Sequence, residues 1–275
     1  MTNRKSDSSP RVLILRAAGT NCDAETQHAF EIAGASCERV HINRVLENPS
    51  MLEQVQILAI PGGFSYGDDI AAGKILATQL SNALSPALKQ FVASKKPVIG
   101  ICNGFQVLVK TNLLPGPLAG ALEQGQLCTL AHNTIGRFQD HWVHLHAPQT
   151  HCIWTKDLIG KTISLPVAHG EGRFLCASDA VRTALHANGH VALRYTRHDG
   201  SAADGEFPHN PNGSTDDIAG ICDATGLVFG LMPHPERHIS SLQHPTWTSR
   251  ESRSELPAEG LSIFAGAVSY CRGTL

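Results

Sequence analysis

The sequence lacks the features that mark membrane proteins and nucleic-acid-binding proteins. No apolar run approaches the roughly 20 residues that cross a bilayer, and no long run of basic residues is present. The formal net charge of the 275 residues is −2 at pH 7, so no broad positive field would attract nucleic acid or an anionic membrane. We therefore expect no membrane partner and no nucleic-acid partner.

The first ten residues, MTNRKSDSSP, are polar and lack the apolar centre of a signal peptide. We expect them to form a disordered tail over residues 1–10. The remaining chain is long enough to bury one large core, and 42% of the sequence is hydrophobic. We expect a single domain over residues 11–275.

Eight cysteines are present, but no two of them form a CxxC pair. A chain of this length folds without disulfides, so their wide spacing favours reduced thiols in the cytoplasm. We expect most of them to be packing residues, although one could be reactive. The eight are Cys22, Cys37, Cys102, Cys128, Cys152, Cys176, Cys222 and Cys271.

Signals for metal ligation and for phosphate binding are also missing. His144 and His146 would share one face of a strand within the histidine-rich segment 141–151, but no acidic or cysteine set stands at ligand spacing around them. The glycine-rich segment PGGFSYGDD at 61–69 does not follow the P-loop pattern GxxxxGK followed by Ser or Thr. We expect no metal and no cofactor in this chain.

Short apolar runs alternate with helical segments in the first 110 residues, which predicts an α/β fold with a parallel sheet and helices on both faces. Strands are expected at 11–16, 38–42, 57–60 and 97–101, and helices at 23–33, 49–55, 70–94 and 105–110. Beyond residue 117 short strand-like runs predict an antiparallel part, with a hairpin of 218–222 and 227–231. Helices are expected at 178–187 and 258–271, the second after a polar stretch at 249–255.

A cysteine between two glycines stands where a buried strand meets a helix. Cys102 lies between Gly100 and Gly104, in the turn that joins the strand at 97–101 to the helix at 105–110. This arrangement is typical of a nucleophile elbow, in which the positive N-terminus of the helix favours a thiolate. The alternative is a buried structural cysteine, and this stretch alone does not decide between the two.

The segment 232–237 offers a base for that thiol. Pro233 and Pro235 fix the backbone around His234 and exclude a helix or a central strand there. Side chains at i and i+2 of an extended segment emerge on one side. Glu236 could therefore hold one ring nitrogen of His234 and leave the other to face a nucleophile. A histidine on a surface turn beside an acid is the alternative.

The glycine loop at 61–69 follows a buried strand and reaches the same edge of the sheet as Cys102. Gly62 and Gly63 would let backbone N–H groups approach a reacting oxygen closely. Together with the N–H of Asn103, they would form an oxyanion hole. A plain tight turn is the alternative.

These motifs resemble those of class I glutamine amidotransferases, which carry a Cys–His–Glu triad. GICNGFQ and PHPE carry this triad. Five longer or additional motifs, one of which contains PHPE, resemble those of the family of glutaminase subunits of phosphoribosylformylglycinamidine synthase. The resemblance covers about residues 11–237, in order, and implies a flavodoxin-like three-layer sandwich with a mainly parallel central sheet and an antiparallel extension. The five are PGGFSYGDD (61–69), PVAHGEGRF (166–174), NPNGS (210–214), IAGIC (218–222) and MPHPER (232–237).

The resemblance implies a role for each residue of the triad. Cys102 would attack the side-chain amide carbon of L-glutamine, His234 would move the protons, and Glu236 would orient His234. A glutamyl thioester would follow, and water would release glutamate.

Further positions match the family's motifs. The oxyanion would rest on N–H groups at Gly63 and Asn103, beside Gly62. Gln106 would hold the amino-acid end of glutamine. His169, Glu171 and Arg173 would lie near the substrate or a partner.

The resemblance also implies partners. Ammonia would pass to a synthetase subunit that uses ATP and Mg to convert formylglycinamide ribonucleotide to formylglycinamidine ribonucleotide in de novo purine biosynthesis. A small accessory subunit would complete the assembly.

Three other interpretations remain open from the residues alone. The chain could be the glutaminase subunit of another amidotransferase complex, although NPNGS and AHGEG would not be needed there. It could instead be a non-catalytic thiol sensor or chaperone-like protein on the same fold, which would need no Glu236. A scaffold with an inactive glutaminase is the third, and the intact triad argues against it.

Overall fold

The computed structural model describes residues 9–121, 125–249 and 258–274. The expected tail lies largely outside these residues, as does most of the polar stretch at 249–255. That residues 11–275 form a single domain stays a prediction. None of the described helices is long and apolar enough to cross a membrane.

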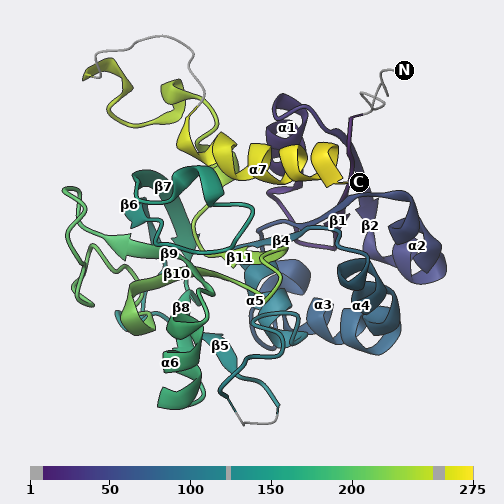
Figure 1. Cartoon of the computed structure of the whole chain (residues 1–275), viewed down its shortest axis with the longest axis horizontal. Coiled ribbons are helices and arrows are strands. Elements are labelled where there is room, and N and C mark those ends of the chain that lie inside the picture. The colour runs from purple at the N-terminus through teal and green to yellow at the C-terminus, as the bar shows by residue number, and fades with distance from the viewer. Residues whose placement is uncertain (1–8, 122–124, 250–257, 275) are drawn as a thin grey trace.

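A nine-stranded sheet runs through the molecule in the order β2-β1-β3-β4-β11-β10-β9-β6-β7 (Figure 1). The first five strands in this order are parallel, and every pairing from β11 to β7 is antiparallel. The expected α/β fold, mainly parallel with an antiparallel extension, is confirmed. The parallel strands are β2 (Ser36–His41), β1 (Arg11–Arg16), β3 (Ile57–Ile60), β4 (Val98–Ile101) and β11 (Val228–Leu231).

The antiparallel part contains the predicted hairpin, because β10 (Ile218–Cys222) pairs with β11. The sheet continues through β9 (Val191–Thr196), β6 (Gln139–His146) and β7 (Thr162–His169). A separate ribbon of two antiparallel strands is formed by β5 (Cys128–Ala131) and β8 (Arg173–Cys176).

Helices cover both faces of the parallel strands (Figure 1). On one face lie α1 (Asp23–Ile32) and α7 (Glu259–Thr274), which contact each other. On the other lie α3 (Lys74–Gln79), α4 (Ser85–Ala93) and α5 (Asn103–Lys110). Two further α-helices are α2 (Ile42–Glu47) and α6 (Asp179–Ala187).

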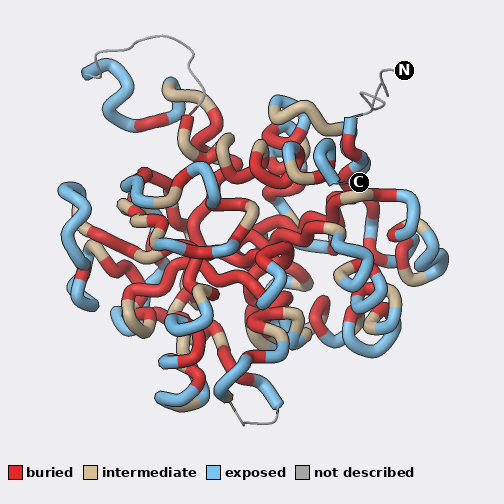
Figure 2. Tube along the Cα trace, viewed as in Figure 1, coloured by how far each residue is buried: buried red, intermediate tan, exposed pale blue. Residues whose placement is uncertain are grey.

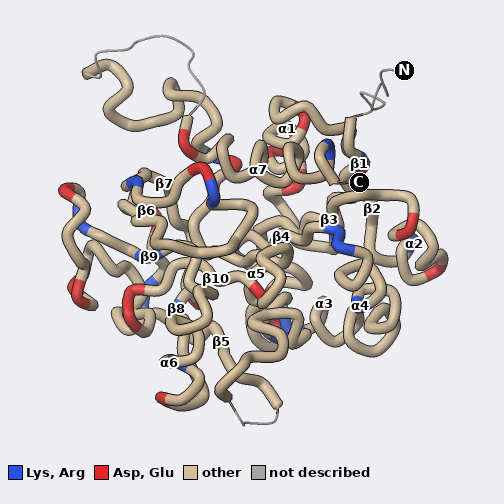
Figure 3. Tube along the Cα trace, viewed as in Figure 1, with Lys and Arg blue, Asp and Glu red and all other residues tan. Residues whose placement is uncertain are grey.

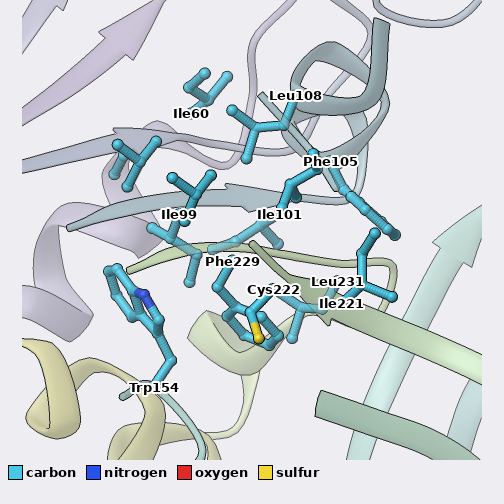
Figure 4. Close-up of a cluster of buried hydrophobic side chains, with 14 of the residues drawn as sticks. Ile60, Ile99, Ile101, Phe105, Leu108, Trp154, Ile221, Cys222, Phe229 and Leu231 are labelled. Atoms are coloured by element: carbon cyan, nitrogen blue, oxygen red, sulfur yellow. The ribbon is translucent and has the colours of Figure 1, made fainter. Parts of the chain in front are cut away.

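Burial of the central strands on both faces explains why their sequences are continuous apolar runs. Every residue of β3, β4 and β11 is buried, because helices shield both faces of these strands. Figure 2 shows this burial concentrated along the sheet. In Figure 4 the side chains of Ile99 and Ile101 lie between Trp154 on one side and Leu108 on the other.

Three local features differ from the sequence expectations. The helix expected at 49–55 is present as a 3-10 helix, Pro49–Gln54, the tighter form that is frequent in connecting segments. The helix α2 was not expected from the sequence. The helix expected from residue 105 in fact begins at Asn103, directly after Cys102.

Charged residues of both signs are interspersed along the chain (Figure 3). Several of them form ion pairs: Arg237 pairs with Glu25 of α1 at 3.0 Å, and Arg197 pairs with Glu206 within the connection after β9 at 2.6 Å.

Candidate active site

Four loops meet beyond the carboxyl ends of four parallel strands that are neighbours in the sheet. The chain leaves β1 toward Cys22, β3 toward the glycine loop at 61–69, β4 toward Cys102, and β11 toward segment 232–237. In open α/β sheets ligands bind at this edge. Residues that lie up to 212 positions apart in the chain therefore share one site.

Cys102 adopts the strained backbone of a nucleophile elbow. Its φ and ψ are 51° and −106°, outside the regions that a side chain favours. Its N–H donates to the carbonyl of Leu231 at 2.8 Å, and its Sγ lies 3.6 Å from the carbonyl oxygen of Ala168. The next turn has room only for glycine, since a Cβ on Gly104 would lie 1.8 Å from the carbonyl oxygen of Ile60.

His234 and Glu236 form a buried pair. The Nδ1 atom of His234 lies 2.7 Å from Oε1 of Glu236, and the side chains are 2% and 0% exposed. The backbone at His234 is extended, with φ −104° and ψ 91°, and its N–H donates to the carbonyl of Pro166 at 2.8 Å. Among the described residues, Nε2 of His234 has no hydrogen-bond partner. That nitrogen is available to a nucleophile or a leaving group.

Opposing effects act on the pKa of His234. Burial alone would lower this pKa, because a charged ring loses its hydration. The carboxylate of Glu236 and the sulfur of Cys102 outweigh burial and raise the pKa well above its ordinary value. The imidazole is therefore held as a strong base beside Cys102.

Gly62 lies between the histidine and the cysteine. A Cβ at this position would lie 2.8 Å from Cε1 of His234 and 3.4 Å from Cβ of Cys102. Glycine is therefore required for the two side chains to stand this close. The next residue, Gly63, has φ +137°, a conformation open to glycine, and it pairs with Thr20 in an isolated β-bridge.

Asn103 ties the elbow to the glycine loop. Its Oδ1 accepts from the hydroxyl of Ser65 at 2.6 Å, and its Nδ2 donates to Oδ1 of Asp68 and to Oε1 of Gln106, both at 3.0 Å. Gln106 in turn donates to the backbone carbonyl of Glu171 at 2.5 Å. The side chains of Asn103 and Gln106 thus hold three loops together around the elbow.

A cleft of about 250 Å³ opens above the sulfur of Cys102. Its described lining includes the carboxylates of Asp68 and Glu171 and the ring of His132, but no lysine or arginine. Burial raises the pKa of Asp68, with smaller opposing effects from the N–H of Gly73 and from Asn103. A ligand with an ammonium group would find complementary charge here.

His169 also lines the cleft, and it is kept neutral. It is 3% exposed, and its Nδ1 lies 3.2 Å from Oδ1 of Asn133. Burial, with a smaller contribution from the nearby charge of His234, lowers its pKa to about 3. Arg173, the first residue of β8, is not among the described residues that line the cleft. The sequence-predicted set is therefore brought together except for Arg173, and the roles of all these residues stay predictions.

Cys22 is a site neighbour that the sequence did not reveal. Its Sγ lies 3.9 Å from Nδ1 of His234 and 3.2 Å from Nη2 of Arg237, which also pairs with Glu25. Burial raises the pKa of this thiol. Its position after β1, at the carboxyl edge of the sheet, was the one available signal.

Cys22, His234 and Glu236 form the one group in the described part of the chain whose ligand atoms could surround a metal ion, all within 4.8 Å of one another. Two features oppose this use. The His234–Glu236 hydrogen bond already occupies the atoms concerned, and the Arg237 guanidinium brings positive charge to the sulfur. The expectation that no metal binds stays a prediction.

Comparisons with known proteins agree with this geometry. Residues 9–271 match the family described as the CobB/CobQ-like glutamine amidotransferase domain. The chain is 44% identical over 266 residues to phosphoribosylformylglycinamidine synthase subunit PurQ of Dehalococcoides mccartyi, covering 96% of this chain and 99% of that protein. The chain belongs to the PurQ family of glutamine amidotransferases. A PurQ subunit of Treponema denticola is 47% identical over 240 residues, covering 84% and 88% of the two chains.

Solved structures extend this PurQ likeness to the fold. A chain in the structure of PurLQS from Thermotoga maritima superposes with a TM-score of 0.70 at 29% identity, covering 96% of this chain and 99% of that chain. A glutamine amidotransferase of Thermotoga maritima, at 13% identity and a TM-score of 0.54, shares the fold. The class I glutamine amidotransferase fold implied by the sequence motifs is confirmed.

Proposed function

We propose that this chain is the glutaminase subunit of phosphoribosylformylglycinamidine synthase, with Cys102 as nucleophile, His234 as base and Glu236 as its orienting partner. Membership of the PurQ family gives the reaction. The observation that supports the residue roles is the buried 2.7 Å pair of His234 and Glu236, packed through Gly62 against Cys102.

The reaction begins when His234 takes the proton of Cys102 and the sulfur attacks the side-chain amide carbon of glutamine. The imidazolium then donates its proton to the departing nitrogen, and the C–N bond breaks to give ammonia and a glutamyl thioester. Water, deprotonated by His234, attacks the thioester; the C–S bond breaks to release glutamate, and the imidazolium returns its proton to the sulfur of Cys102. Glu236 stabilises the imidazolium during both the formation and the hydrolysis of the thioester.

The tetrahedral intermediates place a negative charge on the amide oxygen. We assign its binding to backbone N–H groups at Gly63 and Asn103, which flank Cys102 at the sheet edge. The amino-acid end of glutamine would extend into the cleft toward Gln106. There the carboxylates of Asp68 and Glu171 suit its ammonium group.

The ammonia is used by a synthetase subunit, where ATP and Mg activate formylglycinamide ribonucleotide, and a small accessory subunit completes the complex. We place the synthetase contact at the mouth of the cleft. Phe64 and Phe138 line it, are 46% and 50% exposed, and lie with their rings tilted by 31° and their centroids 6.3 Å apart. Exposed aromatic residues beside a site are typical of docking surfaces. The free state of all eight cysteines supports a cytoplasmic location.

The deciding experiment compares two nitrogen sources in the reconstituted complex. Cys102→Ala should abolish formylglycinamidine ribonucleotide synthesis from glutamine and leave synthesis from ammonia largely intact. Cys37→Ala, which removes a thiol far along the sheet on β2, should leave both intact. Loss of both activities in Cys102→Ala would mean that the cysteine is structural.

A further inference from the structure

Two other thiols face each other across the ribbon of β5 and β8. Cys128 is the direct cross-strand partner of Cys176 in this antiparallel pair. The neighbouring pair, Leu127 and Ala177, is hydrogen-bonded, because the N–H of Ala177 donates to the carbonyl of Leu127 at 2.8 Å. Hydrogen-bonded and non-hydrogen-bonded pairs alternate along an antiparallel ladder. Cys128 and Cys176 therefore occupy a non-hydrogen-bonded position.

This position brings side chains closest together. In a non-hydrogen-bonded pair the Cα atoms stand about 4.5 Å apart, which lies within the range of about 4.4–6.8 Å that a disulfide spans. Both sulfurs are thiols in the structure. A bond between them would need a rotation about the side chains and no shift of the strands.

We propose that Cys128 and Cys176 are a thiol–disulfide site, oxidised by a small disulfide such as glutathione disulfide and separate from the catalytic cysteine.

Exposure and charge single out the attacking sulfur. Cys176 is half-buried at the end of β8, whereas Cys128 is 2% exposed. The hydrogen bond from Cys128 lowers the pKa of Cys176, burial opposes this, and Arg182 assists it. The same contact and burial raise the pKa of Cys128. Cys176 is thus the more accessible sulfur and the one to attack first, and Cys128 is the resolving thiol.

Thiol–disulfide exchange with glutathione disulfide would proceed in two steps. The thiolate of Cys176 attacks one sulfur of glutathione disulfide, the S–S bond breaks, and one glutathione leaves and takes up a proton. Cys128 then gives up its proton and attacks the sulfur of Cys176, and the second glutathione leaves. Two electrons pass from the cysteine sulfurs to glutathione disulfide, which ends as two thiols.

The other close thiol pair lacks these features. Burial and the thiol of Cys152 raise the pKa of Cys222, and both residues are fully buried. An oxidant in solution cannot reach either sulfur of this pair. The pair of Cys152 and Cys222 therefore serves as an internal negative control for the proposed site at Cys128 and Cys176.

The ribbon carries one wall of the cleft. The chain enters β8 directly from the loop of His169 to Gly172, and Asn133, just after β5, binds the carbonyl of His169 at 2.8 Å and the N–H of Gly172 at 3.0 Å. A covalent bond at the far end of the ribbon would restrain this loop by fixing both strands that support it.

The test equilibrates the full chain in glutathione buffers of graded potential, alkylates the free thiols and maps disulfides by peptide mass spectrometry. We expect a peptide pair joined through Cys128 and Cys176, which reducing agent releases. The thermal midpoint should rise by roughly 5–10 °C on oxidation, because the bond closes a long loop of the unfolded chain. Amide exchange of residues 126–131 and 173–177 should slow.

Cys176→Ser should lose the joined peptide and the rise in midpoint, while the matched variant Cys37→Ser, which also removes a half-buried thiol, should keep both. The measurement is repeated in Cys102→Ala, which removes the reactive thiol of the cleft, and the joined peptide should persist. The proposal is overturned if the joined peptide is absent at every potential, or if oxidation joins other cysteines. Neither result depends on glutaminase activity, so the site is tested apart from the proposed function.

Discussion

The Nδ1 atom of His234 lies 2.7 Å from Oε1 of Glu236, and both side chains are buried. Burial on its own would keep this histidine neutral, and the carboxylate reverses that preference. The second nitrogen of the ring is left without a hydrogen-bond partner among the described residues. The pair therefore combines a fixed ring orientation with a raised basicity.

Replacing the carboxylate while keeping its shape tests that relationship. Glu236→Gln retains a hydrogen-bonding group but removes the charge that stabilises the imidazolium. We expect kcat of the partner-activated glutaminase to fall by about 10²–10⁴, with little change in KM, because Glu236 is fully buried and is not among the described residues that line the cleft. Steady-state kinetics of the complex measure this. An unchanged kcat would show that His234 is oriented by something else.

The closeness of His234 and Cys102 depends on Gly62. In Gly62→Ala the new methyl group would lie 2.8 Å from the histidine ring, so the ring must move away from the sulfur. We expect a loss of activity of at least about 10²-fold, with the chain still folded by circular dichroism. The control is Gly273→Ala on α7, where a Cβ would come within 4 Å of none of the described atoms outside the adjoining turn of the helix; full activity is expected there. Full activity in Gly62→Ala would contradict the packing argument.

A glutamine analogue with an electrophilic carbon in place of the amide should label Cys102 alone among the eight thiols. Cys22 is the critical comparison, because it also contacts His234 but burial raises its pKa and keeps it protonated. Peptide mass spectrometry locates the label. In Cys102→Ala the label should disappear rather than move to Cys22, and uniform labelling would disprove the elbow interpretation.

His169 should make the protein less stable in acid. Its folded pKa is lowered to about 3, while in the unfolded chain it is about 6.5. Between these values the unfolded state binds a proton that the folded state does not, so the free energy of unfolding decreases as pH falls. The contribution approaches about 1.4 kcal/mol per pH unit within this window.

Urea unfolding of wild type and His169→Gln at several pH values isolates that contribution. Burial also lowers the pKa of His144 and His190, but both remain in the two proteins and cancel in the difference. The difference in the free energy of unfolding should vary with pH below about 6.5 and be constant above it. A difference that is constant throughout would mean that His169 takes up its proton at the same pH in the folded and the unfolded chain.

Substituting an aromatic residue at the mouth of the cleft tests whether the synthetase subunit docks there. Phe138→Ser should weaken binding of the synthetase subunit about tenfold or more and reduce its activation of glutamine hydrolysis. The basal rate of the isolated chain, which we expect to be slow, gives the reference. Ile32→Ser removes an apolar side chain of similar exposure, 49%, from α1 and should bind normally. Equal binding by both variants would place the contact elsewhere.

The amino-acid sequence by itself determined the class of fold and the two halves of the site. Alternating apolar runs and helices are local patterns, so the strands near 11–16, 57–60 and 97–101 were predictable from short windows. The elbow around Cys102 and the extended turn of His234 and Glu236 are likewise set by glycine and proline at fixed spacings. These signals lie within a few residues of each other.

Only the tertiary structure brought the halves together and showed what surrounds them. Cys22 was missed, because its proximity to His234 arises from the order of strands β1, β3, β4 and β11 and from no local pattern. Arg173 lies at the start of β8 and is not among the described residues that line the cleft, so its expected place near the substrate or a partner stays a prediction. Sequence fixes the conformation of a segment through nearby residues, whereas contacts between distant loops depend on how the sheet orders its strands.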